Sequence, residues 1–193
     1  RELTNELLVQ AMVGRTITDL YPKKKVPIGE TILEVKNLRQ TGNFRNVSFS
    51  VRRGEIFGLT GLVGAGRSEL CQAICGVTTY ESGTVILNGE TVRFTHPLQS
   101  MQKKLGYLPE DRQVQGLVLD WSIFRNITLP SLRKYSTAAG LNSKQERQDG
   151  EAFRKKLSIR TKDIDEKVSA LSGGNQQKVV FAKLLNLDLN VLI

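Results

Sequence analysis

A glycine-rich turn that joins an apolar run to a helical pattern constrains this sequence more than any other feature. The apolar run at residues 56–59 predicts a buried strand, and residues 67–74 have the apolar spacing of a helix. The turn between them fits the phosphate-binding pattern G-x-x-x-x-G-K-[ST], except that Arg67 replaces lysine. In such a turn, backbone N–H groups converge on a phosphate, and the positive end of the following helix adds to the attraction.

Seven residues of this turn are candidate contacts to a bound nucleotide. They are Gly61, Gly64, Ala65, Gly66, Arg67, Ser68 and Glu69. The Ser68 hydroxyl is also the candidate ligand of Mg²⁺. The alternative is a tight strand-to-helix turn that binds nothing. A dinucleotide fingerprint fits less well, because Glu69 stands where that pattern requires a small residue.

Composition narrows the class of protein. With 193 residues, 39% of them hydrophobic, the chain suits one soluble domain with a sizeable core. Apolar runs fall short of the ~20 residues of a membrane span, and no secretory signal is visible. The net charge of +9 comes from basic clusters dispersed among acidic residues, without aromatic stacking platforms, so we expect no nucleic-acid partner. Cys71 and Cys75 are the only cysteines, and the single histidine is distant in sequence, which is too few ligands for a zinc site. Packed thiols are therefore favoured.

Local patterns predict a β layer in the first half of the chain. Apolar and polar residues alternate at 31–38 and 46–51, as in half-buried antiparallel strands. The dipeptide Asn88-Gly89 between two short apolar runs predicts a hairpin. Pro97 suits the first turn of a helix that extends through residues 101–105.

The first 30 residues have a different pattern from the rest. Residues 2–13 have the spacing of an amphipathic helix, and residues 21–29 are rich in proline and lysine. We therefore expect residues 1–30 to be the tail of a preceding domain and a linker, and residues 31–193 to form the main domain.

Helical spacing from Trp121 onward predicts a separate helical subdomain at about residues 115–171. Trp121, Phe124 and Ile127 lie at helical spacing within it. They could line a groove that receives a membrane partner, but packing inside the subdomain is the favoured interpretation because large apolar residues are usually buried.

A second glycine-rich stretch follows the first by about a hundred residues and reads Leu171-Ser172-Gly173-Gly174-Asn175-Gln176-Gln177-Lys178. It resembles the LSGGQ signature of ABC ATPases, and residues 174–187 are predicted to form the helix behind it. Free amides at the start of such a helix can face a γ-phosphate. The resemblance implies that Ser172, Gly173, Gly174 and Gln176 act in trans, on a nucleotide held by another domain.

Most of the chain is similar to the second, C-terminal ATP-binding half of tandem ABC sugar-import ATPases of the ribose, galactose, xylose and arabinose type. Beyond the shared ABC motifs, the resemblance rests on Met12-Val13-Gly14-Arg15, on the phosphate loop with its arginine, on Pro109-Glu110-Asp111-Arg112 followed by Gly116-Leu117, and on Asn175-Gln176-Gln177-Lys178. An importer of the related autoinducer-2 sugar shares these motifs, so the sugar stays open.

The resemblance implies an α/β fold, namely an ABC-type P-loop nucleotide-binding domain with an antiparallel β layer and a helical subdomain. It implies ATP and Mg²⁺ as ligands and a peripheral place on the cytoplasmic face of the membrane. Expected partners are the first ATP-binding half of the same polypeptide, membrane permease subunits and, indirectly, a periplasmic or extracellular sugar-binding protein. The alternative is a soluble ABC ATPase acting on DNA or the ribosome. That class would call for zinc cysteines, a coiled-coil insertion or a second basic arm, which the sequence lacks.

Four positions depart from the usual ABC pattern. Arg67 offers a planar guanidinium in place of a compact ammonium. Glu110 stands at the Q-loop position, where glutamine would contact Mg²⁺ and the attacking water. Glu69 adds a negative charge where threonine is usual. Phe44 is the nearest candidate for the aromatic residue that stacks on adenine, and a core role suits it equally well.

In ABC ATPases, the buried strand that residues 190–193 begin continues into the Walker B aspartate and glutamate, and a switch histidine follows later. These residues bind Mg²⁺ and activate water. The 193 residues contain none of them, since His96 precedes the Q-loop position. We therefore expect no catalytic residue here, with Glu110 a doubtful candidate, and no ATP hydrolysis by the chain alone.

Overall fold

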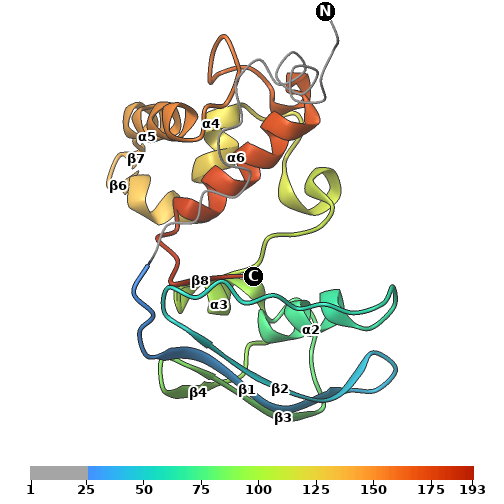
Figure 1. The fold of residues 1–193 in the computed structure, drawn as a ribbon. Helices are drawn as coiled ribbons and strands as arrows, with labels where there is room; N and C mark the ends of the chain where they lie inside the picture. Colours follow the sequence, from blue (N-terminus) through green and yellow to red (C-terminus); the bar gives the residue numbers. More distant parts are fainter. Residues whose placement is uncertain (1–25) are drawn as a thin grey trace, which may run out of the picture.

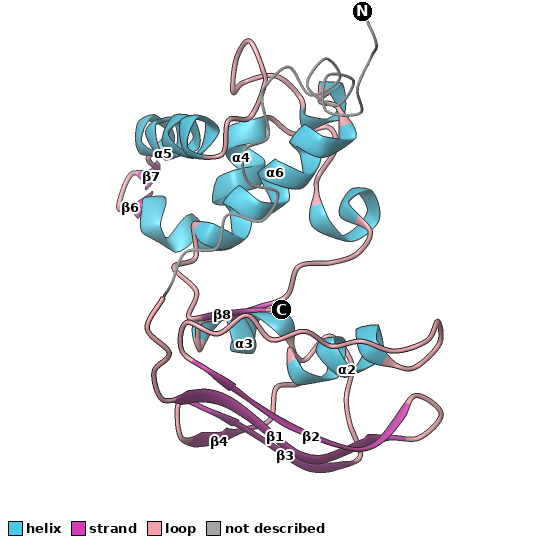
Figure 2. Cartoon of the chain, viewed as in Figure 1, coloured by secondary structure: helices cyan, strands magenta, loops and turns pink. Residues whose placement is uncertain are grey.

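An antiparallel sheet and a group of helices form the two parts of the computed structural model, which describes residues 26–193 (Figures 1 and 2). Figure 1 shows α2 (Arg67–Ile74), α3 (Pro97–Gln102) and β8 (Val191–Leu192) between the sheet and the remaining helices. The predicted helix at residues 2–13 and most of the predicted linker lie outside the described residues.

The sheet has four strands in the order β2-β1-β3-β4, and each neighbouring pair is antiparallel. The strands are β1 (Thr31–Gln40), β2 (Phe44–Arg52), β3 (Ser82–Leu87) and β4 (Glu90–Val92). The two strands predicted from alternation are confirmed as β1 and β2. The hairpin at Asn88-Gly89 is confirmed too, because φ values of 51° and 79° are the left-handed conformations that a type I′ turn requires.

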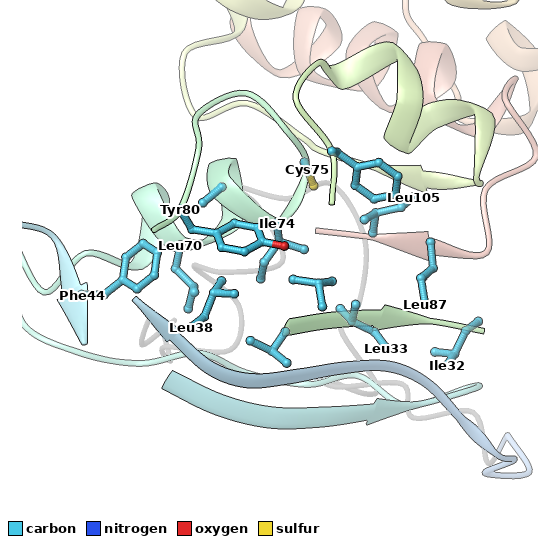
Figure 3. Close-up of a cluster of buried hydrophobic side chains, with 14 residues drawn as sticks. Ile32, Leu33, Leu38, Phe44, Leu70, Ile74, Cys75, Tyr80, Leu87 and Leu105 are labelled. Atoms are coloured by element: carbon cyan, nitrogen blue, oxygen red, sulfur yellow. The ribbon is translucent and has the colours of Figure 1, made fainter. Parts of the chain in front are cut away.

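One face of the sheet packs against α2 to form a hydrophobic core (Figure 3). Strand β1 contributes Leu33 and Val35, each 1% exposed, and α2 contributes Leu70 and Ile74 from the same helical face. Figure 3 shows Leu33 of β1 and Leu70 and Ile74 of α2 on facing sides of this core. Cys75 lies in this core, where burial raises the pKa of its thiol to about 12, so the thiol stays protonated as a packing group.

The helical part lies between β5 (Leu105–Gly106) and β8 in the sequence. Its elements are η1 (Arg112–Gly116, a π-helical turn), α4 (Ile123–Thr128), η2 (Leu129–Tyr135), the small hairpin β6 (Ser136–Thr137) and β7 (Gly140–Leu141), α5 (Ser143–Lys156), η3 (Val168–Ala170) and α6 (Gly173–Leu185). A second hydrophobic core, which includes Ile127, Val168 and Val179, joins these elements. The predicted fold class, α/β with an antiparallel β layer and a helical part, is confirmed. Within residues 26–193, every helix is too short or too polar to cross a membrane.

The buried strand predicted at residues 56–59 is wrong. The segment forms no strand, and Ile56 is 100% exposed. A parallel strand gains its hydrogen bonds only from neighbouring strands. Among the described residues, β5 (Leu105–Gly106) and β8 form the one parallel pair, and residues 56–59 do not join it. Their apolar side chains therefore line an open cavity beside Val191 and Ile193.

The helix predicted through residues 101–105 is too long. α3 (Pro97–Gln102) begins at Pro97 as expected, with the His96 side chain accepting the amide of Leu98 as N-cap. Lys104 then adopts a φ of 64°, the left-handed conformation that commonly ends a helix, and the chain enters β5.

The burial predicted for the apolar triplet near residue 124 is partly wrong. Phe124 and Ile127 are buried as expected, at 4% and 0% exposure, whereas Trp121 is 43% exposed. α4 begins only at Ile123, so Trp121 lies in the turn before the helix and does not share its buried face.

Candidate functional site

The phosphate loop leads directly into α2, and Gly66 sets the path between them. Gly66 is the N-cap of α2 and has a φ of 80°, the left-handed conformation that favours glycine. A Cβ at Gly66 would overlap the carbonyl oxygen of Asn43, in the turn between β1 and β2. No side chain among residues 26–193 caps α2, so within this range the first amides of the helix have no side-chain acceptor and can donate to an anion.

The side chains after Gly66 stay close to the loop. The aliphatic part of Arg67 runs back over Gly61, with its Cδ 3.7 Å from the place that a Cβ there would take. Ser68 is exposed in the first turn of α2, where its hydroxyl can reach a metal ion held by phosphate oxygens. The seven predicted residues thus lie in the loop and in the first turn of α2, and the uncapped amides with the exposed Ser68 hydroxyl suit the phosphates of ATP and a Mg²⁺ ion.

The signature turn opens α6 in a similar way. Ser172 is the N-cap but its side chain does not cap the helix; instead its Oγ accepts a hydrogen bond from Asn175 Nδ2 at 3.1 Å. The first amides of α6 therefore also lack a side-chain acceptor. Around Gly174, no described atom other than its chain neighbours and the nearby backbone of α6 lies within 4 Å of the place that a Cβ would take. Packing within residues 26–193 therefore does not require glycine at this position.

The two glycine-rich turns lie in different parts of the molecule. Figure 1 shows α2 against the sheet, whereas α6 runs from the far side of the helical part back toward β8. The signature turn is at the far end of α6, so the structure does not bring Ser172, Gly173 or Gly174 to the chain's own phosphate loop. One chain therefore presents two separate surfaces with free helical amides.

Glu110 lies exposed at the rim of a shallow depression on the side of η1. The other residues that line the depression are Gln72, Tyr107, Asp111, Arg112, Gln113 and Gln115. Asp111 starts η1, since its Oδ1 accepts the amides of Gln113 and Val114 at 2.9 and 3.0 Å. Glu110 therefore sits between β5 and the π-helical turn η1, accessible from outside.

Arg112 contacts the signature turn, which the sequence does not indicate. Its Nε donates to Gln176 Oε1 at 3.2 Å, and its Nη2 lies 2.6 Å from the place that a Cβ at Gly173 would take. Gln176 is 4% exposed, and its Nε2 donates to the carbonyl of Val168 at 3.3 Å. The polar groups of Gln176 are thus used inside the chain. The sequence marked Arg112 only as part of a motif, because no local pattern predicts a contact across 64 residues.

Phe44 packs in the core that joins the sheet to α2. It is 7% exposed and lies among Leu38, Leu70 and their neighbours (Figure 3). The core role is therefore the one that the structure supports, and stacking on adenine is not.

A family model and similar known proteins point to the same family. Residues 44–193 match the family model described as ABC transporter. The chain is 44% identical over its full length to the ribose import ATP-binding protein RbsA of Lactococcus lactis subsp. cremoris (strain SK11), and it spans 39% of that protein. It is 44% identical, over 96% of its length, to the putative ribose/galactose/methyl galactoside import ATP-binding protein 1 of Rhizobium etli, and it spans 36% of that protein. The chain thus spans less than half the length of these relatives.

Solved structures give the same fold at lower identity. The dimeric structure of MJ0796, a bacterial ABC transporter cassette, aligns with a TM-score of 0.68 and 20% identity, covering 83% of this chain and 72% of that one. The structure of cbiO1 from Clostridium perfringens aligns with a TM-score of 0.65 and 20% identity, covering 84% of this chain and 64% of that one. At this identity the likeness shows the fold alone.

Proposed function

The chain belongs to the ABC transporter family, and from that premise we propose that it is part of a tandem ATP-binding subunit that drives monosaccharide import. In this proposal, residues 31–193 belong to the second, C-terminal nucleotide-binding domain, with residues 115–171 as its helical subdomain, and residues 1–30 join it to the first half. Identity of 44% to two sugar-import proteins supports the substrate class. The cargo is a sugar of the ribose or galactose type, with the autoinducer-2 sugar as the alternative.

The phosphate loop binds ATP and Mg²⁺ in this proposal. ATP supplies the phosphoryl group whose transfer to water drives the transport cycle. The loop amides and the start of α2 donate to the phosphates, Arg67 adds a positive charge, and Ser68 is a ligand of Mg²⁺. The planar guanidinium of Arg67 does not fill the same slot as a lysine ammonium, so we expect this loop to bind nucleotide with little turnover.

The signature turn acts on a nucleotide that the other half holds. The observation that carries this step is the open space at Gly174, at the uncapped start of a helix that lies away from the chain's own loop. The amides of Gly173 and Gly174, with Ser172 beside them, can donate there to a γ-phosphate on a facing domain. Gln176 supports the turn from behind, since its side chain is hydrogen-bonded within the chain.

The partners in this proposal are a first ATP-binding half and membrane permease subunits, with a sugar-binding protein acting through the permease. The protein would lie peripherally on the cytoplasmic face of the membrane. Trp121 and several residues of η1 are exposed, which supports contact with a permease at the helical part.

Transport into sealed vesicles tests the proposal. Vesicles that contain the tandem protein and its permease, with ATP on the side of the ATP-binding protein, are expected to take up labelled ribose or galactose when the sugar-binding protein is present. Competition between these sugars and autoinducer-2 identifies the cargo. If ATP drives no uptake of any of these sugars, the proposed function is wrong.

A further inference from the structure

One face of the signature helix α6 is joined along its length to the short turn η1. The residues on this face are Gly173, Gln176, Val180 and Lys183, which are spaced three, four and three apart and therefore form one helical stripe. Each of them contacts η1 within Arg112–Gly116. The two elements are 64 to 67 residues apart in these hydrogen bonds, so the joint is a tertiary contact and not a consequence of local sequence.

At the signature end, Arg112 makes the joint. Its Nε donates to Gln176 Oε1 at 3.2 Å, and the Gln113 side chain donates to the same oxygen at 3.3 Å. The guanidinium lies over Gly173, with Cζ 3.4 Å from the place that a Cβ would take. Glycine at this position therefore lets the guanidinium rest on the signature turn itself.

At the other end, Gly116 makes the joint. A Cβ at Gly116 would lie 3.1 Å from a Val180 methyl carbon, and Lys183 Nζ donates to the Gly116 carbonyl at 2.8 Å. Burial lowers the pKa of Lys183, and no carboxylate among residues 26–193 forms an ion pair with it. A methionine at position 183 would fill similar space without the cost of desolvating a charge. The presence of lysine is therefore better explained by the hydrogen bond from its ammonium to η1 than by packing.

Part of η1 is accessible from outside. Val114 is 80% exposed, and Gln115 is exposed beside Glu110 on the depression already described. η1 therefore has residues attached to the signature helix and residues open to a partner. A partner that moves the exposed part of η1 would act on the signature turn through Arg112.

We propose that Arg112 is a positioning residue that locks the signature turn to η1, so that a permease contact at η1 moves Gly173 and Gly174 relative to the facing nucleotide. This inference rests on the proposed import function. In it, Gly173 is glycine so that Arg112 can seat on the turn, whereas Gly174 is glycine for the partner's nucleotide. Arg112 touches neither nucleotide; it acts through the turn.

The lock is tested in the tandem protein with its permease by the ratio of ATP turnover with sugar-loaded binding protein to turnover without it. Arg112→Ala is expected to lower this ratio about fivefold or more, the lower range of measured coupling between sites. Arg133→Ala, which removes an exposed positive charge from the same helical part, is the matched control and should leave the ratio unchanged. A wild-type ratio in Arg112→Ala overturns the inference.

Amide hydrogen exchange of the same protein without nucleotide gives a second readout. In Arg112→Ala, amides of η1 and the hydrogen-bonded amides of α6 from Gln176 onward should exchange faster, and those of α5 should not. Faster exchange in η1 alone would mean that Arg112 only holds its own turn, and would also overturn the lock. If Arg112→Ala does not fold, Arg112→Lys replaces it, since lysine keeps the charge but has no Nε–H and no planar group to cover Gly173.

The two failures are distinguishable. Absence of sugar-stimulated turnover in the wild type contradicts the proposed import function. The exchange measurement still decides whether Arg112 locks the turn, because it needs neither permease nor sugar.

Discussion

The two glycine-rich turns of this chain look alike in sequence, yet different surroundings account for their glycines. At Gly66 the backbone is left-handed, with a φ of 80°, and a side chain would overlap the carbonyl oxygen of Asn43. At Gly174 the space where a side chain would stand is free of other atoms of the described chain. The phosphate loop therefore needs glycine in order to fold, whereas the signature turn has room for a side chain and still lacks one. A glycine that folding does not require points to a surface that something else approaches.

The largest effect on the chain itself is expected at Gly66. Gly66→Ala combines left-handed strain with the overlap at Asn43, and we expect it to lower the free energy of unfolding by about 3 kcal/mol or more. Gly64→Ala is the matched control, because Gly64 has the same φ of 80° but no neighbour within 4 Å. Strain alone should cost about 1–2 kcal/mol there. Urea denaturation measures the free energy of unfolding of both variants. An equal loss in the two would contradict the claim that the overlap at Asn43 makes glycine necessary at Gly66.

A smaller effect is expected on nucleotide affinity when the loop loses its cation. Arg67→Ala should weaken ATP binding by about 1–3 kcal/mol, because a charge-assisted hydrogen bond is lost while the backbone amides remain. Calorimetry measures the affinity, with Arg53→Ala, an exposed arginine outside the loop, as the control. Unchanged affinity in Arg67→Ala would show that this side chain is not a phosphate ligand.

A still smaller effect concerns the pH dependence of stability at Lys183. Its pKa in the folded chain is lowered by burial, so at neutral pH the folded state carries a desolvated ammonium. As pH rises through the folded pKa toward the ordinary value of 10.5, the folded chain releases this proton before the unfolded chain does, and the cost disappears.

Lys183→Met is therefore expected to remove a part of the pH dependence. The stability of the wild type relative to this variant should rise as pH approaches 10.5, measured by urea denaturation at a series of pH values. A difference between the two proteins that stays constant, or falls with pH, would mean that Lys183 is not desolvated as the structure has it.

Local patterns predicted the elements that depend on near neighbours. The alternation in β1 and β2, the Asn88-Gly89 hairpin and the helix that begins at Arg67 each follow from a few adjacent residues. The segment at residues 56–59 failed because a buried parallel strand depends on other strands to pair with it, which hydrophobicity alone does not supply.

The candidate site divides in the same way. The two glycine-rich turns were visible as contiguous motifs, and the phosphate loop is one continuous turn in the structure. The contact of Arg112 with Gly173 could not be predicted from the sequence, because it depends on how η1 packs against α6, 64 residues away along the chain. The difference between Gly66 and Gly174 was hidden for the same reason, because it lies in the neighbours of each glycine and not in the glycine itself.

The most direct test of the signature turn is sugar uptake by the tandem protein with Gly174→Asp. A carboxylate in the first turn of α6 suits the helix dipole, and a Cβ at this position meets no described atom beyond the nearby backbone of α6, so folding stability should be unchanged or slightly higher. ATP binding at the Arg67 loop should also stay at the wild-type value. The same carboxylate would stand where a facing γ-phosphate must sit, so we predict that ATP-driven uptake into vesicles falls about a hundredfold. Uptake at the wild-type rate by a folded Gly174→Asp protein would contradict the claim that this turn acts on a nucleotide outside its own chain.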